Sequence, residues 1–236
     1  MGVLGNQIPD RIARIRHCRN RYVEELRRLN ILADVDYVFV ADLDGMNSKV
    51  SRAGVRSSFS REGWSVVLAN QLGGYYDLLA LRHATWCPTD ILRELRSEQD
   101  MIEKSNLSRF SIMKRGKRRL EFDRARKKVI YSKMRMISTS SDWIDVDSGF
   151  GGLGIYRSEV FADFDYTLKA EDAVYESEHV ALSNRIVQSG GKIFINPRMI
   201  NNFFNTYNIN RIFAIRQIRE IYWNSLKWLK PLFKRS

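Results

Sequence analysis

The sequence predicts an α/β fold, because segments of helical periodicity alternate with short apolar segments of β-strand character. Residues 8–30 carry apolar side chains at three-, four- and seven-residue spacings, which is typical of an amphipathic helix. The apolar run Tyr37–Ala41 follows. It is too short for a helix and rich in valine, which indicates a buried strand. With 236 residues the chain suits a single α/β domain spanning residues 1–236.

The later elements continue this alternation. We expect strands in four further segments, namely Trp64–Ala69, Asp77–Arg82, Trp143–Val146 and Lys192–Asn196. Pro197 should end the last of these strands. A helix should begin near Ser177 and close at Gly190-Gly191, since glycine is favoured just after a helix C-terminus.

The composition is that of an ordinary globular protein, with 44% hydrophobic and 28% charged residues. No apolar run approaches the roughly 20 residues of a membrane-spanning helix, and the N-terminal residues lack the apolar core of a signal peptide. Cys18 and Cys87 are too few for a disulfide framework, and they lack the spacing of a zinc site. We therefore expect a cytoplasmic protein.

The net charge of +12 is concentrated in one segment. Residues 114–135 contain eleven Lys or Arg against Glu121 and Asp123, so this segment carries +9 and leaves +3 for the rest of the chain. A surface that binds nucleic acid would show a broader basic bias, so nucleic acid is not the expected partner. We expect residues 88–136 to form an inserted helical, basic segment. It would face an anionic acceptor, a membrane or RNA, or simply solvent.

Residues 208–236 are predicted to form a basic amphipathic helix. Ile212, Ile215 and Ile218 share one face of it, and Trp223 and Trp228 are rings of the kind that settle at a lipid interface. Such a helix either docks on its own domain or lies on an anionic membrane. A peripheral membrane contact is therefore one of two open readings.

The D-x-D string at Asp42 and Asp44 is the strongest candidate for a functional site. The chain contains four such strings, but only this one directly follows a buried strand and precedes a glycine. Ligands of open α/β sheets bind at the carboxyl ends of strands. Residues two apart in an extended chain project to one side, so both carboxylates could share Mn²⁺ or Mg²⁺. A simple turn at the strand end is the alternative.

Five segments of the chain, in order, resemble one group of GT-A glycosyltransferases. YVFVADLDG (residues 37–45) resembles their metal-binding strand, and RIARIRHCRNRYV (residues 11–23) resembles the arginine-rich helix that precedes it. Downstream follow YYDLLALRH, SGFGGLGIYR and SEHVALSNRIVQSGGKIFINP. The combination resembles the fungal capsular mannosyltransferase-like proteins and their bacterial and viral relatives. It implies a GT-A-like (Rossmann-like) mixed sheet flanked by helices.

The resemblance also implies an activity, namely transfer of a hexose from a nucleotide-sugar donor to a glycan or lipid-linked acceptor with the help of Mn²⁺ or Mg²⁺. The implied donor-binding residues are Arg14, Arg19, Asn20, Asp42, Asp77 and Arg82. Glu178 would be the general base, with Asp147 as the rival candidate, and His179 would join Asp42 and Asp44 as a metal ligand. Gly151 and Gly152 would let the backbone approach the acceptor.

Structural roles remain open for the same residues: an internal Asp77–Arg82 pair, a glutamate that favours the helix dipole, and a half-buried histidine. Relatives in this group begin with a strand that cradles the donor base, whereas this chain starts at the arginine helix, so we expect an incomplete donor pocket. Two other functions therefore remain open. One is a catalytically idle binding protein on the same scaffold, and the other is a metal-dependent phosphoryl-transfer enzyme.

Overall fold

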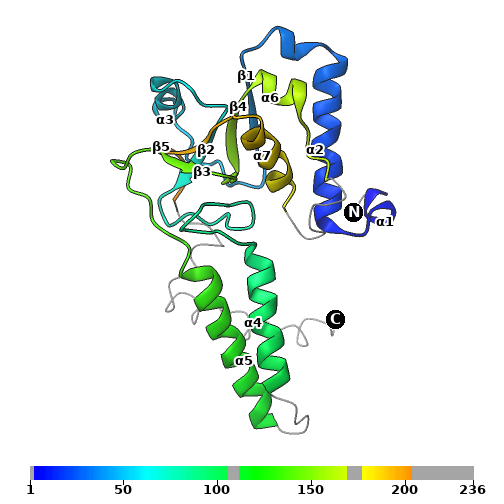
Figure 1. Ribbon diagram of the computed structural model, residues 1–236, viewed down its shortest axis with the longest axis vertical. Helices are drawn as coiled ribbons and strands as arrows, with labels where there is room; N and C mark the ends of the chain where they lie inside the picture. The colour runs from blue at the N-terminus through cyan, green and yellow to red at the C-terminus, as the bar shows by residue number, and fades with distance from the viewer. Residues whose placement is uncertain (1–2, 106–111, 169–176, 204–236) are drawn as a thin grey trace, which may run out of the picture.

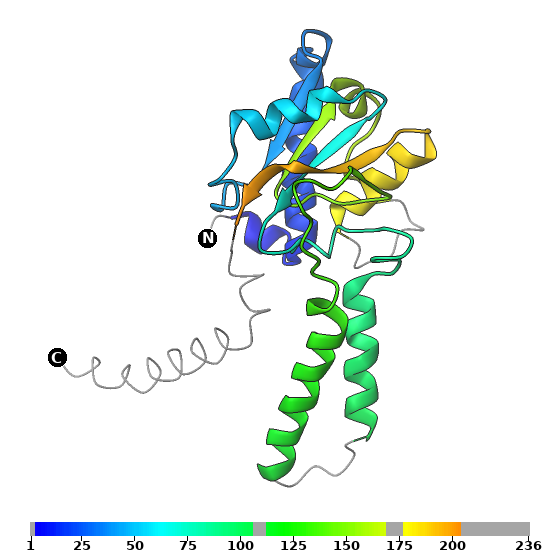
Figure 2. The ribbon, with the colours of Figure 1, turned by 90° about the vertical axis from the view of Figure 1, so that its left-hand side faces the viewer.

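The computed structural model describes residues 3–105, 112–168 and 177–203 (Figure 1). It is a mixed α/β structure built on one five-stranded sheet, so the expected α/β class is confirmed. Helices flank the sheet, and a helical hairpin extends away from it, as the two views in Figures 1 and 2 show.

The sheet is mixed, with the strand order β1-β4-β2-β5-β3. The strands are β1 (Tyr37–Ala41), β2 (Val66–Gln71), β3 (Ile144–Val146), β4 (Leu153–Arg157) and β5 (Ile193–Asn202). β4 is antiparallel to β1 and β2, β2 is parallel to β5, and β3 is antiparallel to β5. β1, β2 and β5 therefore point the same way, and their C-terminal ends meet at one edge of the sheet, here called the carboxyl edge. β4 runs the opposite way and begins at this edge.

Apolar side chains pack on both faces of the sheet, as the alternation along β2 shows. Val66 and Leu68 belong to the larger core cluster, whereas Val67 and Ala69 belong to the smaller one. The larger cluster includes residues of α2 (Arg11–Arg28), α6 (Ser158–Asp163) and α7 (Glu178–Gln188). α3 (Arg52–Arg56) lies on the other face, where Val55 packs against the smaller cluster (Figure 1).

The ends of the helices follow local capping signals. α1 spans Leu4–Gln7, and α2 begins only at Arg11, because the Asp10 side chain accepts a hydrogen bond from the Ala13 amide at 2.7 Å. The prediction that this helix starts at residue 8 was therefore wrong by about one turn. α7 begins after Ser177, as predicted, and stops before Gly190, whose φ of 87° lies in the left-handed region.

The predicted strand Asp77–Arg82 was wrong. Within this segment only Arg82 makes a bridge, with Ser148, and residues 78–80 form a turn. Leu78 and Leu81 are buried three residues apart, which fits a folded loop and not the two-residue alternation of a strand. The apolar residues that suggested a strand are thus buried by a loop that covers the larger core cluster.

The predicted end of the last strand at Pro197 was also wrong, because β5 continues to Asn202. The pairing of β2 with β5 shifts register between Leu68 and Asn70, so that β5 holds extra residues opposite β2 at this point. A proline has no N–H to donate, and such an irregularity is one of the few places in a sheet where it is tolerated. The other predicted strands are present, with boundaries shifted by one or two residues.

The helices expected in the basic insertion are present. α4 (Ile91–Ser105) and α5 (Ile112–Arg126), the latter continued by a π-helical segment at Lys127–Tyr131, form an antiparallel hairpin. The Lys128 Nζ–Glu98 Oε1 distance is 2.6 Å, and Lys133–Glu94 and Arg118–Glu103 pairs also join the two sides. In the described part of the chain, no helix is long and apolar enough to cross a membrane. The predicted helix at residues 208–236 lies outside the described residues.

Candidate functional site

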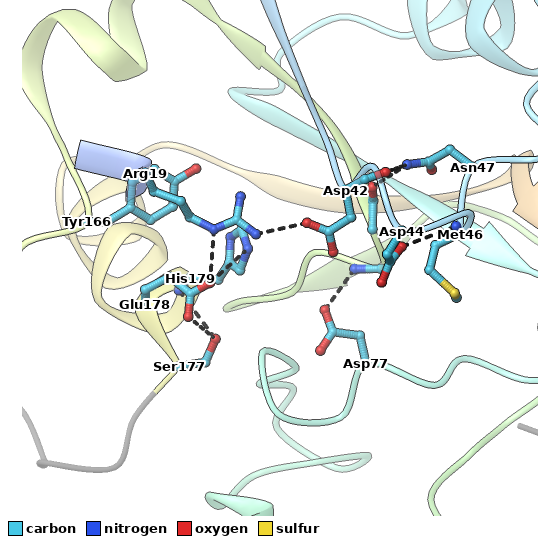
Figure 3. Close-up of polar contacts among 12 residues, drawn as sticks. Arg19, Asp42, Asp44, Met46, Asn47, Asp77, Tyr166, Ser177, Glu178 and His179 are labelled. Carbon is cyan, nitrogen blue, oxygen red and sulfur yellow. Dashed lines mark hydrogen bonds and ion pairs between the residues drawn. The ribbon is translucent and has the colours of Figure 1, made fainter. Parts of the chain in front are cut away.

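The candidate site lies at the carboxyl edge, where three elements bring charged side chains together (Figure 3). Arg19 comes from α2, Asp42 follows β1, and Glu178 is the first residue of α7. Arg19 donates from Nε to Glu178 Oε1 at 2.9 Å and from Nη2 to Asp42 Oδ1 at 3.1 Å. One guanidinium therefore ties two carboxylates, one of which is 159 residues away in the sequence.

The surroundings keep Arg19 charged. Its side chain is 11% exposed, and its guanidinium lies over the rings of Phe150 and Tyr166 at 4.8 and 5.6 Å from their centroids. Burial alone would lower the pKa of Arg19, but Tyr166, Glu178 and Asp42 raise it above its usual value. Arg19 is thus a fixed positive charge at the base of the site.

Asp42 and Asp44 project from the loop after β1. Burial, together with the charges of Asp44 and Glu178, raises the pKa of Asp42, while Arg19 acts in the opposite direction. Asp44 is exposed, and its Oδ1 accepts a hydrogen bond from the Met46 amide at 3.2 Å. Gly45, which follows Asp44, has a φ of 90°, which a residue with a side chain rarely adopts. The turn that was the alternative interpretation is therefore present, and it leaves both carboxylates available.

Asp77 is a third carboxylate near the two aspartates. It lies in the loop between β2 and α4, and its Oδ2 accepts the Gly151 amide at 3.0 Å. Burial is the largest cause that raises its pKa to about 6, and the charges of Glu178 and Asp42 act in the same direction. A carboxyl group with this pKa is suited to proton transfer near neutral pH.

His179 lies deep beside this cluster. It is 3% exposed, stacks on Phe150 with ring centroids 4.0 Å apart, and meets the edge of Tyr166. Its Nε2 lies 3.6 Å from Glu178 Oε1, and neither ring nitrogen has a hydrogen-bond partner among the described residues. Burial and the Arg19 charge lower the pKa of His179 well below its usual value, so the ring is neutral.

The fit of a metal ion to these residues is limited to the aspartate pair. Among residues 3–105, 112–168 and 177–203, no group of three or more His, Cys, Asp or Glu side chains could hold a metal ion. The structure thus does not bring His179 to Asp42 and Asp44. Two carboxylates nevertheless suit Mg²⁺ or Mn²⁺, which proteins often bind through one or two carboxylates plus substrate phosphates. A cation would also offset the burial and the charge repulsion that raise the pKa of Asp42.

A pocket of about 560 Å³ opens beside Asp42. Most of its wall is one face of α2, since the lining residues of this helix recur at helical spacing, and Leu4 of α1 also lines it. The residues that line it are Leu4, Arg11, Arg14, Ile15, Cys18, Arg19, Tyr22 and Asp42. Three arginines against one aspartate make the pocket attractive to an anion that carries an apolar or aromatic part.

Two of the predicted donor-binding residues are engaged in the fold. Arg14 donates from Nη1 to the carbonyl oxygens of Ile8 and Pro9, each at 2.6 Å, yet it still lines the pocket. Asn20 accepts the Tyr166 amide at 2.9 Å and fastens α2 to the segment after α6. Arg14 therefore remains a candidate for binding an anion, whereas the side chain of Asn20 is used for packing.

Arg82 and Asp147 do not join the cluster of Asp42, Asp77 and Glu178. Arg82 pairs with Asp90 at 2.8 Å and not with Asp77, so the internal pair that was the alternative to donor binding is not formed. Asp147 follows β3, whose last residue, Val146, pairs with the beginning of β5, at the edge opposite the carboxyl edge. The structure thus does not place Asp147 with Glu178.

Gly151 and Gly152, predicted to face an acceptor, are the backbone support of the site. Their φ angles are 70° and 86°, and a Cβ on Gly151 would lie 2.9 Å from Gln71 Nε2 and 3.0 Å from a backbone oxygen. Gly152 O accepts the Asp42 amide at 2.9 Å. Three residues whose amides contact this support were not predicted from the sequence, namely Gln71, Asn47 and Asn201. The sequence signal that could have found Gln71 and Asn201 is a polar residue at the end of an apolar strand.

Comparisons of this chain with models of protein families, with curated proteins and with solved structures find no match.

Proposed function

We propose that the chain is a metal-dependent glycosyltransferase that moves a hexose from a nucleotide-sugar donor to a glycan or lipid-linked acceptor. The observation that carries this proposal is the position of Asp42 and Asp44 at the carboxyl edge, beside a pocket lined by arginines. The resemblance of five ordered sequence segments to GT-A glycosyltransferases supports it, because the same segments supply the Arg19, Asp42, Asp77 and Glu178 side chains.

Each side chain has a role in this proposal. A bound Mn²⁺ or Mg²⁺ would neutralise the diphosphate leaving group. Arg19 holds Asp42 and Glu178 in place, and Arg14 with the exposed Arg11 attracts phosphate to the pocket. Asp77 replaces Asp147 as the rival to Glu178 for the proton acceptor, since its pKa near 6 suits that task.

Isothermal titration with UDP or GDP in the presence of Mn²⁺ tests the proposal. We expect wild-type protein to bind the metal nucleotide, and Asp42→Asn and Asp44→Asn to abolish binding while the protein remains folded. The matched control is Asp34→Asn with Asp36→Asn, a second D-x-D pair that precedes the same strand and is exposed. Binding by both site variants equal to that of wild type would refute the metal assignment. Absence of binding in the wild type would favour an idle binding protein.

Cys18 provides a second test that reports on the pocket itself. It is exposed and lines the pocket, whereas Cys87 is buried and serves as an internal control. We expect iodoacetamide to modify Cys18 first, and GDP or UDP with Mn²⁺ to slow that modification. Asp42→Asn should remove the protection. Equal rates with and without nucleotide would place the ligand elsewhere.

A further inference from the structure

One backbone segment supports two of the proposed site carboxylates. Gly152 O accepts the Asp42 amide at 2.9 Å, and the Gly151 amide donates to Asp77 Oδ2 at 3.0 Å. Asp42 follows β1 and Asp77 follows β2, so neither strand alone fixes their separation. The positions of both carboxylates therefore depend on where the Gly151-Gly152 segment lies.

A relay of buried side-chain amides fixes that segment. Gln71, at the end of β2, donates to Gly151 O at 2.9 Å and to Asn201 Oδ1 at 3.0 Å. Asn201, near the end of β5, donates to Gly151 O at 2.8 Å and to Asn47 Oδ1 at 2.9 Å. Asn47 in turn donates to Asp42 O at 2.7 Å and to Gly152 O at 2.9 Å. The relay thus runs from two central strands to the backbone of the aspartate loop.

The relay is held in a single arrangement by its surroundings. Gln71 and Asn201 are 0% exposed, so a broken contact in the relay is not replaced by water. Asn47 cannot turn its amide over, because its oxygen would then face the carbonyl oxygens of Asp42 and Gly152. A side chain on Gly152 would meet Asn201 Nδ2 at 3.3 Å, so the absence of one lets the amide reach the backbone.

We propose that Gln71, Asn201 and Asn47 are positioning residues that set the Asp42–Asp44 loop for metal binding and hold Asp77 beside it. This inference rests on the proposed metal-dependent function. Their amides contact the backbone of Asp42 and of the Gly151-Gly152 segment and act on the carboxylates through it. Outer-shell partners of this kind change metal affinity by about 10- to 100-fold when they are altered.

The test compares two isosteric variants. In Asn201→Asp an oxygen replaces Nδ2, which donates to Gly151 O and to Asn47 Oδ1. Both hydrogen bonds are then lost, because each of these oxygens faces another acceptor. Asn70→Asp is the matched control, because Asn70 is equally buried and donates through Nδ2 to two backbone carbonyls, of Ile137 and Pro197, that belong neither to the relay nor to the aspartate loop. Both variants suffer a similar loss of buried hydrogen bonds, so a purely structural role predicts similar behaviour.

Two measurements on the full chain decide the outcome. Mn²⁺ binding, followed by electron paramagnetic resonance, should weaken about 10- to 100-fold in Asn201→Asp and stay near wild type in Asn70→Asp. Hydrogen exchange should show faster exchange of the amides of residues 42–47 and 151–152 in Asn201→Asp only. Equal Mn²⁺ affinities of Asn201→Asp and wild type, or equal exchange in the two variants, would overturn the inference.

The exchange measurement also separates this inference from the proposed function. If wild-type protein binds no Mn²⁺, the proposed function fails. Even then, faster exchange confined to Asn201→Asp would show that the relay holds the loop in place. Exchange unchanged in Asn201→Asp would overturn the inference.

Discussion

Arg19 shows how a single residue both stabilises the fold and builds the site. Its guanidinium joins α2, the loop after β1 and the start of α7, and the Glu178 side chain that it contacts is only 9% exposed. A charge removed from such a pair leaves its partner buried without compensation. The same guanidinium holds the carboxylates of Asp42 and Glu178 in place. The contacts that stabilise the fold at Arg19 are therefore the same ones that bring the candidate site together.

We predict that Arg19→Ala lowers the free energy of unfolding by about 3 kcal/mol, because Glu178 loses its buried partner. Arg11→Ala is the control; Arg11 is exposed on the same helix, and substitution there should change stability by less than about 0.5 kcal/mol. Urea denaturation measures both. A loss below about 1 kcal/mol for Arg19→Ala would mean that the ion pairs contribute little.

Asp77 gives a prediction about pH. Its carboxyl group ionises near pH 3.8 when unfolded and near 6 when folded, so between these values the folded state binds more protons. The contribution of Asp77 to stability is therefore greatest below about pH 3.8 and is lost as the pH rises through about 6. Asp77→Asn, which does not titrate, should show no such loss. Urea midpoints of both proteins across this pH range test it, and parallel curves would contradict a raised pKa.

At the scale of elements, the hairpin of α4 and α5 is separable from the sheet. The end of the hairpin next to the sheet is anchored in the larger core cluster, where the residues Ile91 and Val129 are 2% and 1% exposed. Farther out, Met101 and Leu120 are 55% and 51% exposed, and the two sides are joined by ion pairs. Exposed pairs of this kind contribute little to global stability.

We therefore expect that replacing residues 99–126 with a short glycine–serine linker leaves a folded sheet with a melting temperature within a few degrees of the wild type. The Glu98–Lys128 contact at 2.6 Å shows that the cut ends lie close together. The contrasting variant is Ile91→Ala at the end next to the sheet, which should cost about 2–5 kcal/mol as a buried large-to-small change. Differential scanning calorimetry compares the two. A collapse of the fold on excision would show that the hairpin is part of the core.

At the scale of the whole molecule, the described residues contain two hydrophobic core clusters, one on each face of the sheet. The core clusters draw on residues from Val23 to Met199. The chain that follows Phe203 carries a basic, tryptophan-containing sequence that was predicted to dock on the domain or on a membrane. Its attachment to the end of β5 places it after the last strand of the sheet.

We predict that a protein ending at Phe203 folds with an unchanged melting temperature and no longer floats with anionic liposomes, whereas the full chain floats at low salt and not at high salt. The physical reason is that attraction between basic side chains and anionic lipid is screened by salt. Neutral liposomes are the control. Flotation of the shortened protein, or no flotation of the full chain at low salt, would rule out the membrane role for this segment.

The sequence by itself determined the features that depend on near neighbours in the chain. The strand before Asp42 and the helix start near Ser177 were predicted, because side-chain alternation and capping act within about four residues. The cap at Asp10 acts over the same short range, although the predicted helix started too early. The same local reasoning placed Asp42 and Asp44 at a strand end.

Only the tertiary structure decided which partners the polar side chains take. Arg19 and Glu178 meet across 159 residues, Arg82 pairs with Asp90 instead of Asp77, and the amide relay links segments that are up to 154 residues apart. A buried hydrogen-bonding group must be paired, but which partner it finds depends on the packing of elements that local patterns do not place. The proline in β5 was tolerated for the same reason, since the register shift that accommodates it arises between strands.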